Sequence, residues 1–232
     1  MEINPIARFH SPFSTKFGIP KQSGLVQELE GKIVFEPDYR HEEALRGIDE
    51  FDFLWLIWEF SGNRHGAASL MVRPPLLGGN AKMGVFATRS PFRPNPLGLS
   101  SVRIKEVEWD TPVGPVIHVC GGDLMDGTPI YDIKPYISYT DSHPDAINGF
   151  VDSLDNHTLN VDFPEHLLKR VPENYKEPLM EVLSHDPRPS YQDDMSRIYG
   201  FEFAGLNIRF SVQEDYLYVR SVEPIIIIKT FS

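Results

Sequence analysis

Alternating apolar and polar positions dominate the first ~140 residues of the chain and predict β-strands. Clusters of Gly, Pro and Asp interrupt the alternation at short intervals, as they do between the strands of a sandwich or a barrel. The pattern predicts strands at Ile6–His10, Lys32–Phe35, Asp52–Phe60, Met83–Thr88, Val102–Trp109, Val116–Val119 and Ile130–Ile133.

Two further local patterns occur in this part of the chain. Residues Leu29–Lys32 predict a hairpin turn between strands Leu25–Leu29 and Ile33–Glu36. Residues His41–Arg46 predict a short helix, which ends where Gly47 follows.

The pattern changes after about residue 142. The polar segment Asp141–Asp155 is typical of a linker, and Pro164–Arg170 and Glu173–Ser184 show helical spacing of their apolar residues. Three more strands are predicted, at Arg197–Phe203, Leu206–Val212 and Tyr216–Ile228. We therefore expect a mainly β protein, with an amino-terminal β-barrel over residues 1–142 and a smaller carboxy-terminal α+β domain over residues 143–232.

Composition restricts the class of protein further. The 232 residues are 41% hydrophobic, enough to bury a sizeable core. The single cysteine, Cys120, excludes an intramolecular disulfide and indicates a reducing compartment. Apolar runs such as Phe53–Trp58 and Ile225–Ile228 are too short to cross a bilayer, and the amino terminus does not have the pattern of a secretory signal. We expect a cytoplasmic protein with no membrane partner.

Charge is distributed unevenly along the chain, whose net charge is −11. The other 190 residues hold 15 basic and 33 acidic side chains, a net charge of −18, whereas residues 64–105 hold no acidic one. That stretch contains Arg64, Arg73, Lys82, Arg89, Arg93, Arg103 and Lys105. It predicts a local positive field for an anionic partner. The alternative is that these side chains are scattered over different faces.

Common cofactor and metal motifs are absent from the sequence. No strand is followed by G-x-G-x-x-G, no P-loop occurs, and Gly78, Gly79 and Gly84 do not have dinucleotide-binding spacing. The eight histidines never fall into H-x-x-x-H or H-x-H, and one cysteine cannot complete a zinc site. We expect no metal site and no doubly wound nucleotide-binding sheet.

Three segments combine rigid Pro, permissive Gly and charged or aromatic side chains: Arg73–Ser100, Gly121–Tyr136 and His185–Tyr191. Such segments shape a backbone around a ligand, although tight turns between strands use the same residues. The crowding of Arg, Asp, Lys and Tyr within them favours function over turns alone.

These segments also carry a family resemblance, through Ser11–Val26, Arg46–Phe60, Val72–Ser100, Asp123–Ser142 and Asp186–Tyr191. The chain resembles the TsaA/TrmO family of S-adenosylmethionine-dependent tRNA methyltransferases. The resemblance implies a β-barrel methyltransferase rather than a Rossmann-type one, and a homodimer. It also implies methyl transfer to N6 of threonylcarbamoyl-adenosine, the base next to the anticodon of threonine tRNA.

The same resemblance implies a set of cofactor contacts. They fall on Pro20, Lys21, Gln22, Ser61, Gly62, Arg89, Leu99, Asp123, Leu124, Met125 and Asp126. The chain departs from the family at two places, with Lys21 where Arg is common and Ser61-Gly62 where a His-Gln pair is common. A side-chain contact is in doubt there, whereas a main-chain contact would survive.

The chemistry itself needs positioning and a proton acceptor, because methyl transfer from a sulfonium is an in-line displacement. Asp126 or Asp132 could accept the N6 proton, with Lys134 or Arg93 tuning the carboxylate. Either aspartate could equally cap a turn. Stacking on an extruded base is expected from Tyr136, Phe92 and Tyr191. RNA contacts are expected from Arg73, Lys82, Arg93, Asn95, Arg188 and Tyr191.

Two other classes of function remain open on the sequence alone. The chain could be a non-catalytic β-barrel that binds RNA or a nucleotide without turnover. Its acidic remainder could also serve a protein partner or self-association.

Overall fold

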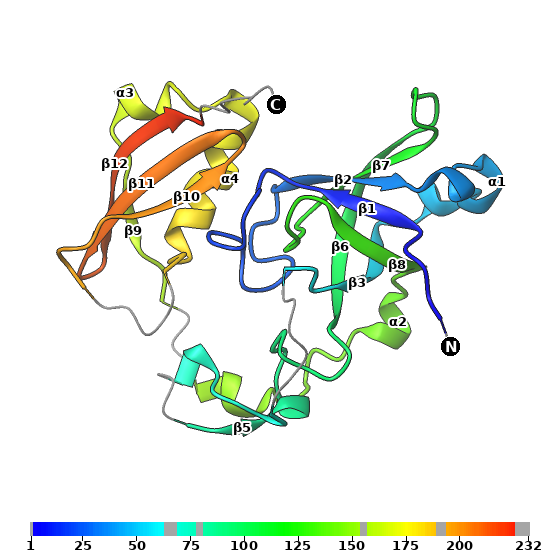
Figure 1. Ribbon diagram of the computed structural model, residues 1–232, viewed down its shortest axis with the longest axis horizontal. Helices are drawn as coiled ribbons and strands as arrows, with labels where there is room; N and C mark the ends of the chain where they lie inside the picture. Colours follow the sequence, from blue (N-terminus) through cyan, green and yellow to red (C-terminus); the bar gives the residue numbers. More distant parts are fainter. Residues whose placement is uncertain (1, 63–68, 78–80, 154–156, 189–193, 226–232) are drawn as a thin grey trace, which may run out of the picture.

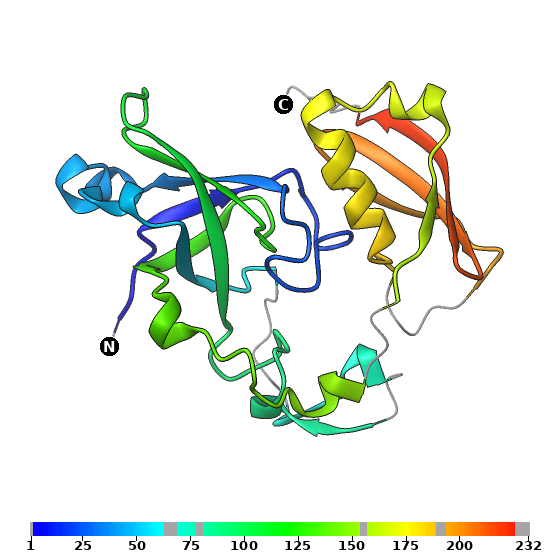
Figure 2. The same ribbon diagram turned by 180° about the vertical axis from the view of Figure 1, so that it is seen from behind.

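The computed structural model describes residues 2–62, 69–77, 81–153, 157–188 and 194–225. A ring of strands and a separate C-terminal sheet lie side by side in it, which both views of the molecule show (Figures 1 and 2). Most regular structure is β, so the mainly β prediction is confirmed. Within the described residues, no helix has the length and apolarity needed to cross a bilayer.

The ring closes in the order β1-β2-β7-β6-β3-β8, because β8 pairs back with β1, and every pairing is antiparallel. Its strands are β1 (Ala7–His10), β2 (Glu30–Phe35), β3 (Phe53–Glu59), β6 (Leu97–Glu108), β7 (Val116–Cys120) and β8 (Thr128–Pro135). Alternate residues point inward and form one core, which includes Phe9, Ile33, Leu54, Leu56, Ile117 and Ile130. This alternation of buried and exposed residues, clearest in β1, β2 and β3, matches the period-2 pattern of the sequence.

Two predictions between β1 and β3 have different outcomes. The predicted hairpin turn at Leu29–Lys32 is wrong, because β2 already begins at Glu30 and the preceding residues form no strand. Val26 and Leu29 are buried, but in the core of the C-terminal sheet. The predicted short helix is confirmed as a single turn, α1 (Glu42–Leu45).

A long connection between β3 and β6 lies outside the ring, below it in Figure 1. It holds the two-stranded sheet of β4 (Met71–Val72) and β5 (Met83–Gly84), with the 3₁₀ turns Pro75–Leu77 and Val85–Ala87. The predicted strand over Met83–Thr88 is wrong beyond Gly84, where Thr88 Oγ1 donates to the Val85 carbonyl oxygen (2.9 Å) and the chain turns.

The C-terminal sheet has the strand order β10-β11-β12-β9. Its strands are β9 (Asn160–Asp162), β10 (Tyr199–Phe203), β11 (Leu206–Gln213) and β12 (Tyr216–Pro224). Helix α3 (Glu165–Leu168) confirms one predicted helix as a short turn, and α4 (Glu173–Ser184) confirms the other over its full length. Helix α4 covers one face of the sheet (Figure 2). Strand β9 lies within none of the predicted strands, because three residues are too few for a period to register.

The predicted linker is not entirely irregular, since it includes the end of α2 (Ser138–Asp141) and the 3₁₀ segment Gly149–Ser153. A more direct connection between the two sheets comes from the β1–β2 connection. Phe13 is fully buried and belongs to the core of the C-terminal sheet, together with Val26 and Leu29. The C-terminal core is therefore completed by residues from the other end of the chain.

Candidate active site

A cavity of about 680 Å³ opens at one end of the ring and extends onto the outer face of β3 and β6. Five segments converge on it: the β1–β2 connection, the end of β3, the turn before β6, β6 itself and the turn before β8. Its lining includes Lys16, Pro20, Lys21, Gln22, Trp55, Trp58, Glu59, Ser61, Gly62, Arg89, Arg93, Leu99, Asp123 and Met125.

Asp123 is the acidic group whose environment in the cavity is most unusual. Ser100 Oγ donates to Asp123 Oδ1 (2.6 Å), and the Trp58 indole Nε1 donates to Ser100 Oγ (2.9 Å). Burial raises the pKa of Asp123, while the Ser100 hydroxyl, the amides of Asp123 and Ser23, and the Arg89 charge act to lower that pKa. Ser100 is itself only 1% exposed, so the carboxylate is held in one orientation by a buried hydrogen-bond chain.

Across the cavity, two side chains fix each other. Arg89 Nη1 donates to Gln22 Oε1, and Gln22 Nε2 donates to the Lys21 carbonyl oxygen (2.6 Å). This contact joins the β1–β2 connection to the turn before β6. The Arg89 guanidinium is thereby a positioned cation, and its charge acts to lower the pKa of Asp123.

Gly62 lies against the flexible end of the Lys16 side chain. A Cβ atom on Gly62 would lie 2.1 Å from Lys16 Cε, so a larger residue at this position would require the lysine to move. Both residues line the cavity.

Trp55 lines the part of the cavity on the outer face of β3, and residues that do not line the cavity hold its side chain in place. Its indole Nε1 donates to Asp141 Oδ2 (2.8 Å), and its ring packs against Tyr136 (centroids 5.6 Å apart). The Ile137 amide and the Trp55 indole hold the pKa of Asp141 below its ordinary value. Tyr136, predicted to stack on the extruded base, thus contacts Trp55, a residue that lines the cavity.

Nine of the eleven residues predicted to bind the cofactor line the cavity. They are Pro20, Lys21, Gln22, Ser61, Gly62, Arg89, Leu99, Asp123 and Met125. The other two do not: the Leu124 side chain is buried in the ring core, and Asp126 accepts hydrogen bonds from His10 Nδ1 (3.0 Å, for the tautomer protonated there) and the Ser11 amide (3.2 Å). The Asp126 geometry is that of a residue that holds a turn.

Asp132 and Lys134 form an ion pair (2.8 Å) on β8, just beyond the lining. Asp132 lies opposite Ile57 and Lys134 opposite Trp55 in the β3–β8 register. Glu59 was not predicted, yet it lines the cavity and accepts a hydrogen bond from the Tyr131 hydroxyl (2.6 Å). Lys16, Trp58 and Ser100 were not predicted either. Of these, only Ser100 lies in one of the three segments singled out by their composition, at the last position of Arg73–Ser100.

The predicted RNA-binding residues do not gather in one place. Arg93 lines the cavity but donates to the carbonyl oxygens of Thr88 (3.1 Å) and Ser90 (3.4 Å). Arg73, Lys82 and Asn95 are exposed outside the cavity. Arg188 Nη2 pairs with Asp186 Oδ2 (2.9 Å), and Tyr191 lies outside the described residues.

The basic stretch is therefore divided. Arg103 pairs with Glu28 (2.9 Å) and Lys105 with Glu30, so its last two charges are neutralised away from the cavity. Arg89 and Arg93 line the cavity, and Arg64 lies outside the described residues. Among the residues that the structure describes, no cluster of His, Cys, Asp and Glu could hold a metal ion.

Comparisons with known proteins identify the family of the chain. The model of the tRNA-methyltransferase O N-terminal domain matches residues 8–142, and that of the TrmO C-terminal domain matches residues 156–225. A crystal structure of TrmO from Pseudomonas aeruginosa superposes with a TM-score of 0.76 and 29% identity, covering 96% of this chain and 98% of that one.

Curated relatives extend over nearly the whole chain. The tRNA (adenine(37)-N6)-methyltransferase of Escherichia coli K12 is 36% identical over 231 residues, 96% of this chain and 98% of its own length. A putative S-adenosylmethionine-dependent methyltransferase, RcsF, of Pseudomonas aeruginosa is 36% identical over 216 residues, 90% and 91% of the two chains. The resemblance found in the sequence is confirmed, and the chain belongs to the tRNA-methyltransferase O (TrmO) family.

Proposed function

We propose that this chain is an S-adenosylmethionine-dependent methyltransferase that acts on N6 of threonylcarbamoyl-adenosine, next to the anticodon of threonine tRNA. The observation that carries the proposal is the convergence of five segments on one cavity that holds a fixed carboxylate, Asp123, and a fixed guanidinium, Arg89. The names of the relatives, a tRNA (adenine(37)-N6)-methyltransferase and a putative S-adenosylmethionine-dependent methyltransferase, support the substrate and the cofactor.

The cavity residues fit S-adenosylmethionine, which when bound supplies an electrophilic methyl group on a cationic sulfur. Asp123, oriented by Ser100, can accept hydrogen bonds from hydroxyl or ammonium groups of such a molecule. Arg89, oriented by Gln22, offers a matching cation for a carboxylate. Met125 adds an apolar surface for an adenine ring.

The protein's part in the reaction is to align the groups and to receive a proton. A bond forms between N6 and the methyl carbon while the carbon–sulfur bond breaks, and the N6 proton must pass to a base. Glu59 in the cavity and Asp132 at its border, paired with Lys134, are the carboxylates we propose for this role. Asp126 is assigned to holding the turn.

We further propose that the strand ring is the family's β-barrel and that the domains comprise residues 1–142 and 143–232. The anticodon loop would approach over the β3–β6 connection, where Arg73, Lys82 and Asn95 are exposed and Arg93 lines the cavity. Roles for Arg188 and Tyr191 in RNA binding remain predictions. A cytoplasmic location fits a tRNA substrate.

A homodimer is part of the proposal. The β3–β6 connection exposes large apolar side chains, namely Leu70 (63%), Met71 (49%), Phe86 (75%) and Phe92 (55%). Large exposed apolar side chains on one segment suit a protein interface.

Cofactor binding and turnover test the proposed function directly. Saturating S-adenosylmethionine should raise the melting temperature, since a ligand that binds only the folded state stabilises it. With a labelled methyl donor, label should enter threonine tRNA that carries threonylcarbamoyl-adenosine, and not the unmodified transcript. Binding without label transfer would favour the non-catalytic alternative, and no thermal shift would exclude the proposed cofactor.

Ser100→Ala removes the donor to Asp123. Because a hydrogen bond to a charged group contributes about 1.5–3 kcal/mol, we expect cofactor affinity to fall roughly 10- to 100-fold. The Ser100 hydroxyl helps to lower the pKa of Asp123, so its removal should raise that pKa. The pH below which cofactor affinity is lost should therefore be higher in the variant.

The matched control for this variant is Ser211→Ala. Ser211 is also a buried serine (5% exposed), and its hydroxyl accepts from Arg220 Nε (2.9 Å) in the C-terminal sheet. Calorimetric titration at several pH values should find cofactor binding unchanged in this control. Equal effects of the two substitutions would remove the assigned role of Ser100.

Asp141→Ala should release the Trp55 indole and weaken tRNA binding more than cofactor binding. The pKa of folded Asp141 lies below its ordinary value of 3.8, so its stabilising contribution is present at neutral pH and lost as the pH falls through the folded-state pKa. The difference in urea midpoint between wild type and variant should therefore shrink at about pH 3, with exposed Asp110→Ala as control. A difference that is independent of pH would contradict this assignment.

The oligomeric state can be measured by sedimentation at micromolar protein, where we expect a dimer. Phe86→Glu places a charge at the most exposed of these four apolar side chains and should shift the protein toward monomer. Ile147→Glu, at a position 91% exposed outside that segment, is the control. A wild-type monomer at these concentrations would exclude the proposed dimer.

A further inference from the structure

The β1–β2 connection carries a wall of the cavity but has no regular secondary structure of its own. It contributes six lining residues, namely Lys16, Ile19, Pro20, Lys21, Gln22 and Ser23. Its ends are joined to the ring, where the Asp126 amide donates to the Phe13 carbonyl oxygen (2.8 Å) and the Gly24 amide donates to the Gly121 carbonyl oxygen (2.9 Å). The middle of the connection needs support from elsewhere.

That support comes from β10, the edge strand of the C-terminal sheet. The Ala204 amide, just after β10, donates to the Pro12 carbonyl oxygen (2.8 Å), and Ser14 Oγ donates to Glu202 Oε2. The fully buried Phe13 ring packs against the rings of Phe201 and Phe203, with centroids 6.3 Å and 5.2 Å away. The two ribbon views place this connection between the ring and the C-terminal sheet (Figures 1 and 2).

Gly18 lies directly against a ring of the C-terminal sheet. A Cβ atom at this position would lie 2.4 Å from Phe201 Cδ2, inside any real contact distance. The Gly18 backbone is left-handed (φ +93°), a conformation that L residues adopt at a cost. Phe17 packs edge-on against the same ring (6.3 Å). The chain therefore bends around the Phe201 ring immediately before Ile19 and Pro20 enter the cavity wall.

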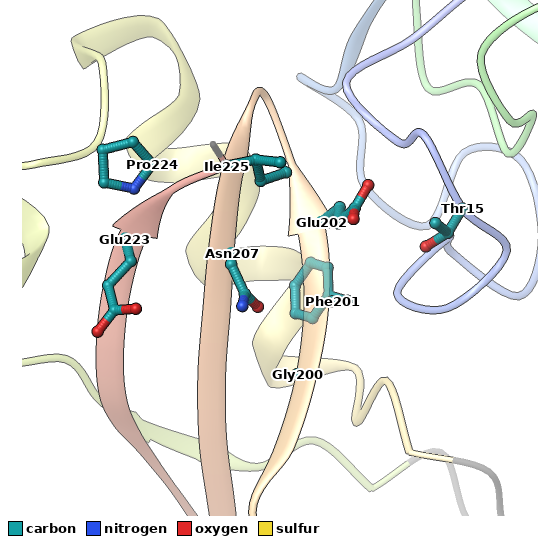
Figure 3. A pocket seen from close by; sticks show the side chains of 8 residues that line it. All are labelled: Thr15, Gly200, Phe201, Glu202, Asn207, Glu223, Pro224 and Ile225. Carbon is teal, nitrogen blue, oxygen red and sulfur yellow. The ribbon is translucent and has the colours of Figure 1, made fainter. Parts of the chain in front are cut away.

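The outer side of this contact is open. A second cavity of about 500 Å³ separates Thr15 from the strand ends, with Glu202 and Phe201 on the facing strand (Figure 3). Beside this cavity, Phe13, Phe17 and Gly18 pack against Phe201, and Ser14 donates to Glu202. Because Phe201 is only 3% exposed, its ring cannot move away without disturbing the C-terminal core.

We propose that the C-terminal sheet sets the cofactor affinity of the cavity by holding the β1–β2 connection, with Phe201 and Gly18 as positioning residues. Neither residue needs to touch the cofactor. A displaced connection would carry Gln22 away from Arg89 and move Pro20 and Lys21 out of the lining. The inference rests on the proposed function, because it explains the cofactor affinity of the proposed site by contacts that lie outside that site.

Gly18→Ala is the first test, in the full-length chain. The added methyl group must push the connection off the Phe201 ring, and misplacement of about 1 Å in a site can cost up to ~10²-fold. We expect the Kd and KM for S-adenosylmethionine to rise by roughly tenfold or more, with the KM for tRNA changed less. Gly47→Ala is the control, because Gly47 is also left-handed (φ +84°) but has no atom within 4 Å of the added Cβ.

Phe201→Leu is the second test, chosen because a leucine keeps the core filled while removing the ring face. It should weaken cofactor binding, and combining it with Gly18→Ala should cost less than the two effects added together, since the methyl group then has room. Melting temperatures of the unliganded variants separate affinity from folding.

The outcomes distinguish this inference from the proposed function. If wild type does not bind S-adenosylmethionine, the proposed function fails. If wild type binds it, and Gly18→Ala binds as tightly as Gly47→Ala, the function stands and the positioning role is overturned. Additive effects of Gly18→Ala and Phe201→Leu would also overturn it.

Discussion

Phe13 follows the end of β1 in the β1–β2 connection, and its side chain is completely buried against Phe201 and Phe203 of the C-terminal sheet. Full burial of such a ring contributes about 1.5–3 kcal/mol, a large share of a typical net stability. The contact also ties the irregular β1–β2 connection to a rigid surface. The cavity wall formed by this connection, and with it the position of Gln22 against Arg89, depends on an interaction between the two ends of the chain.

Electrostatics in the cavity is local and opposite in sign to the chain as a whole. The protein carries a net charge of −11, yet the lining includes four basic side chains and two acidic ones. The two acidic groups are not free surface charges, because Asp123 accepts from Ser100 and Glu59 accepts from Tyr131. The basic side chains suit the phosphates of the proposed tRNA substrate. The two fixed carboxylates suit the cationic sulfonium of the proposed cofactor.

The functional side chains are also held by neighbouring side chains, of which Ser100 and Asp141 do not line the cavity. Trp58 and Ser100 orient Asp123, and Asp141 orients Trp55. Such partners limit the side-chain movement that would otherwise misplace reacting groups. The proposed reaction requires that the protein align the reacting groups, hold a carboxylate in the cavity and accept a proton. Holding these side chains in fixed orientations is therefore the main contribution of the fold.

The sequence by itself determined the mainly β class, the inward face of each long strand and the family, because alternation and long motif strings are properties of neighbouring residues. Nine predicted cofactor residues also meet in one cavity. Only the tertiary structure decided that Ser100 supports Asp123, that Glu28 neutralises Arg103, and that Leu29 belongs to the C-terminal core. Those pairs are separated by tens of residues or more, and periodicity describes which face is buried but not which partner covers it.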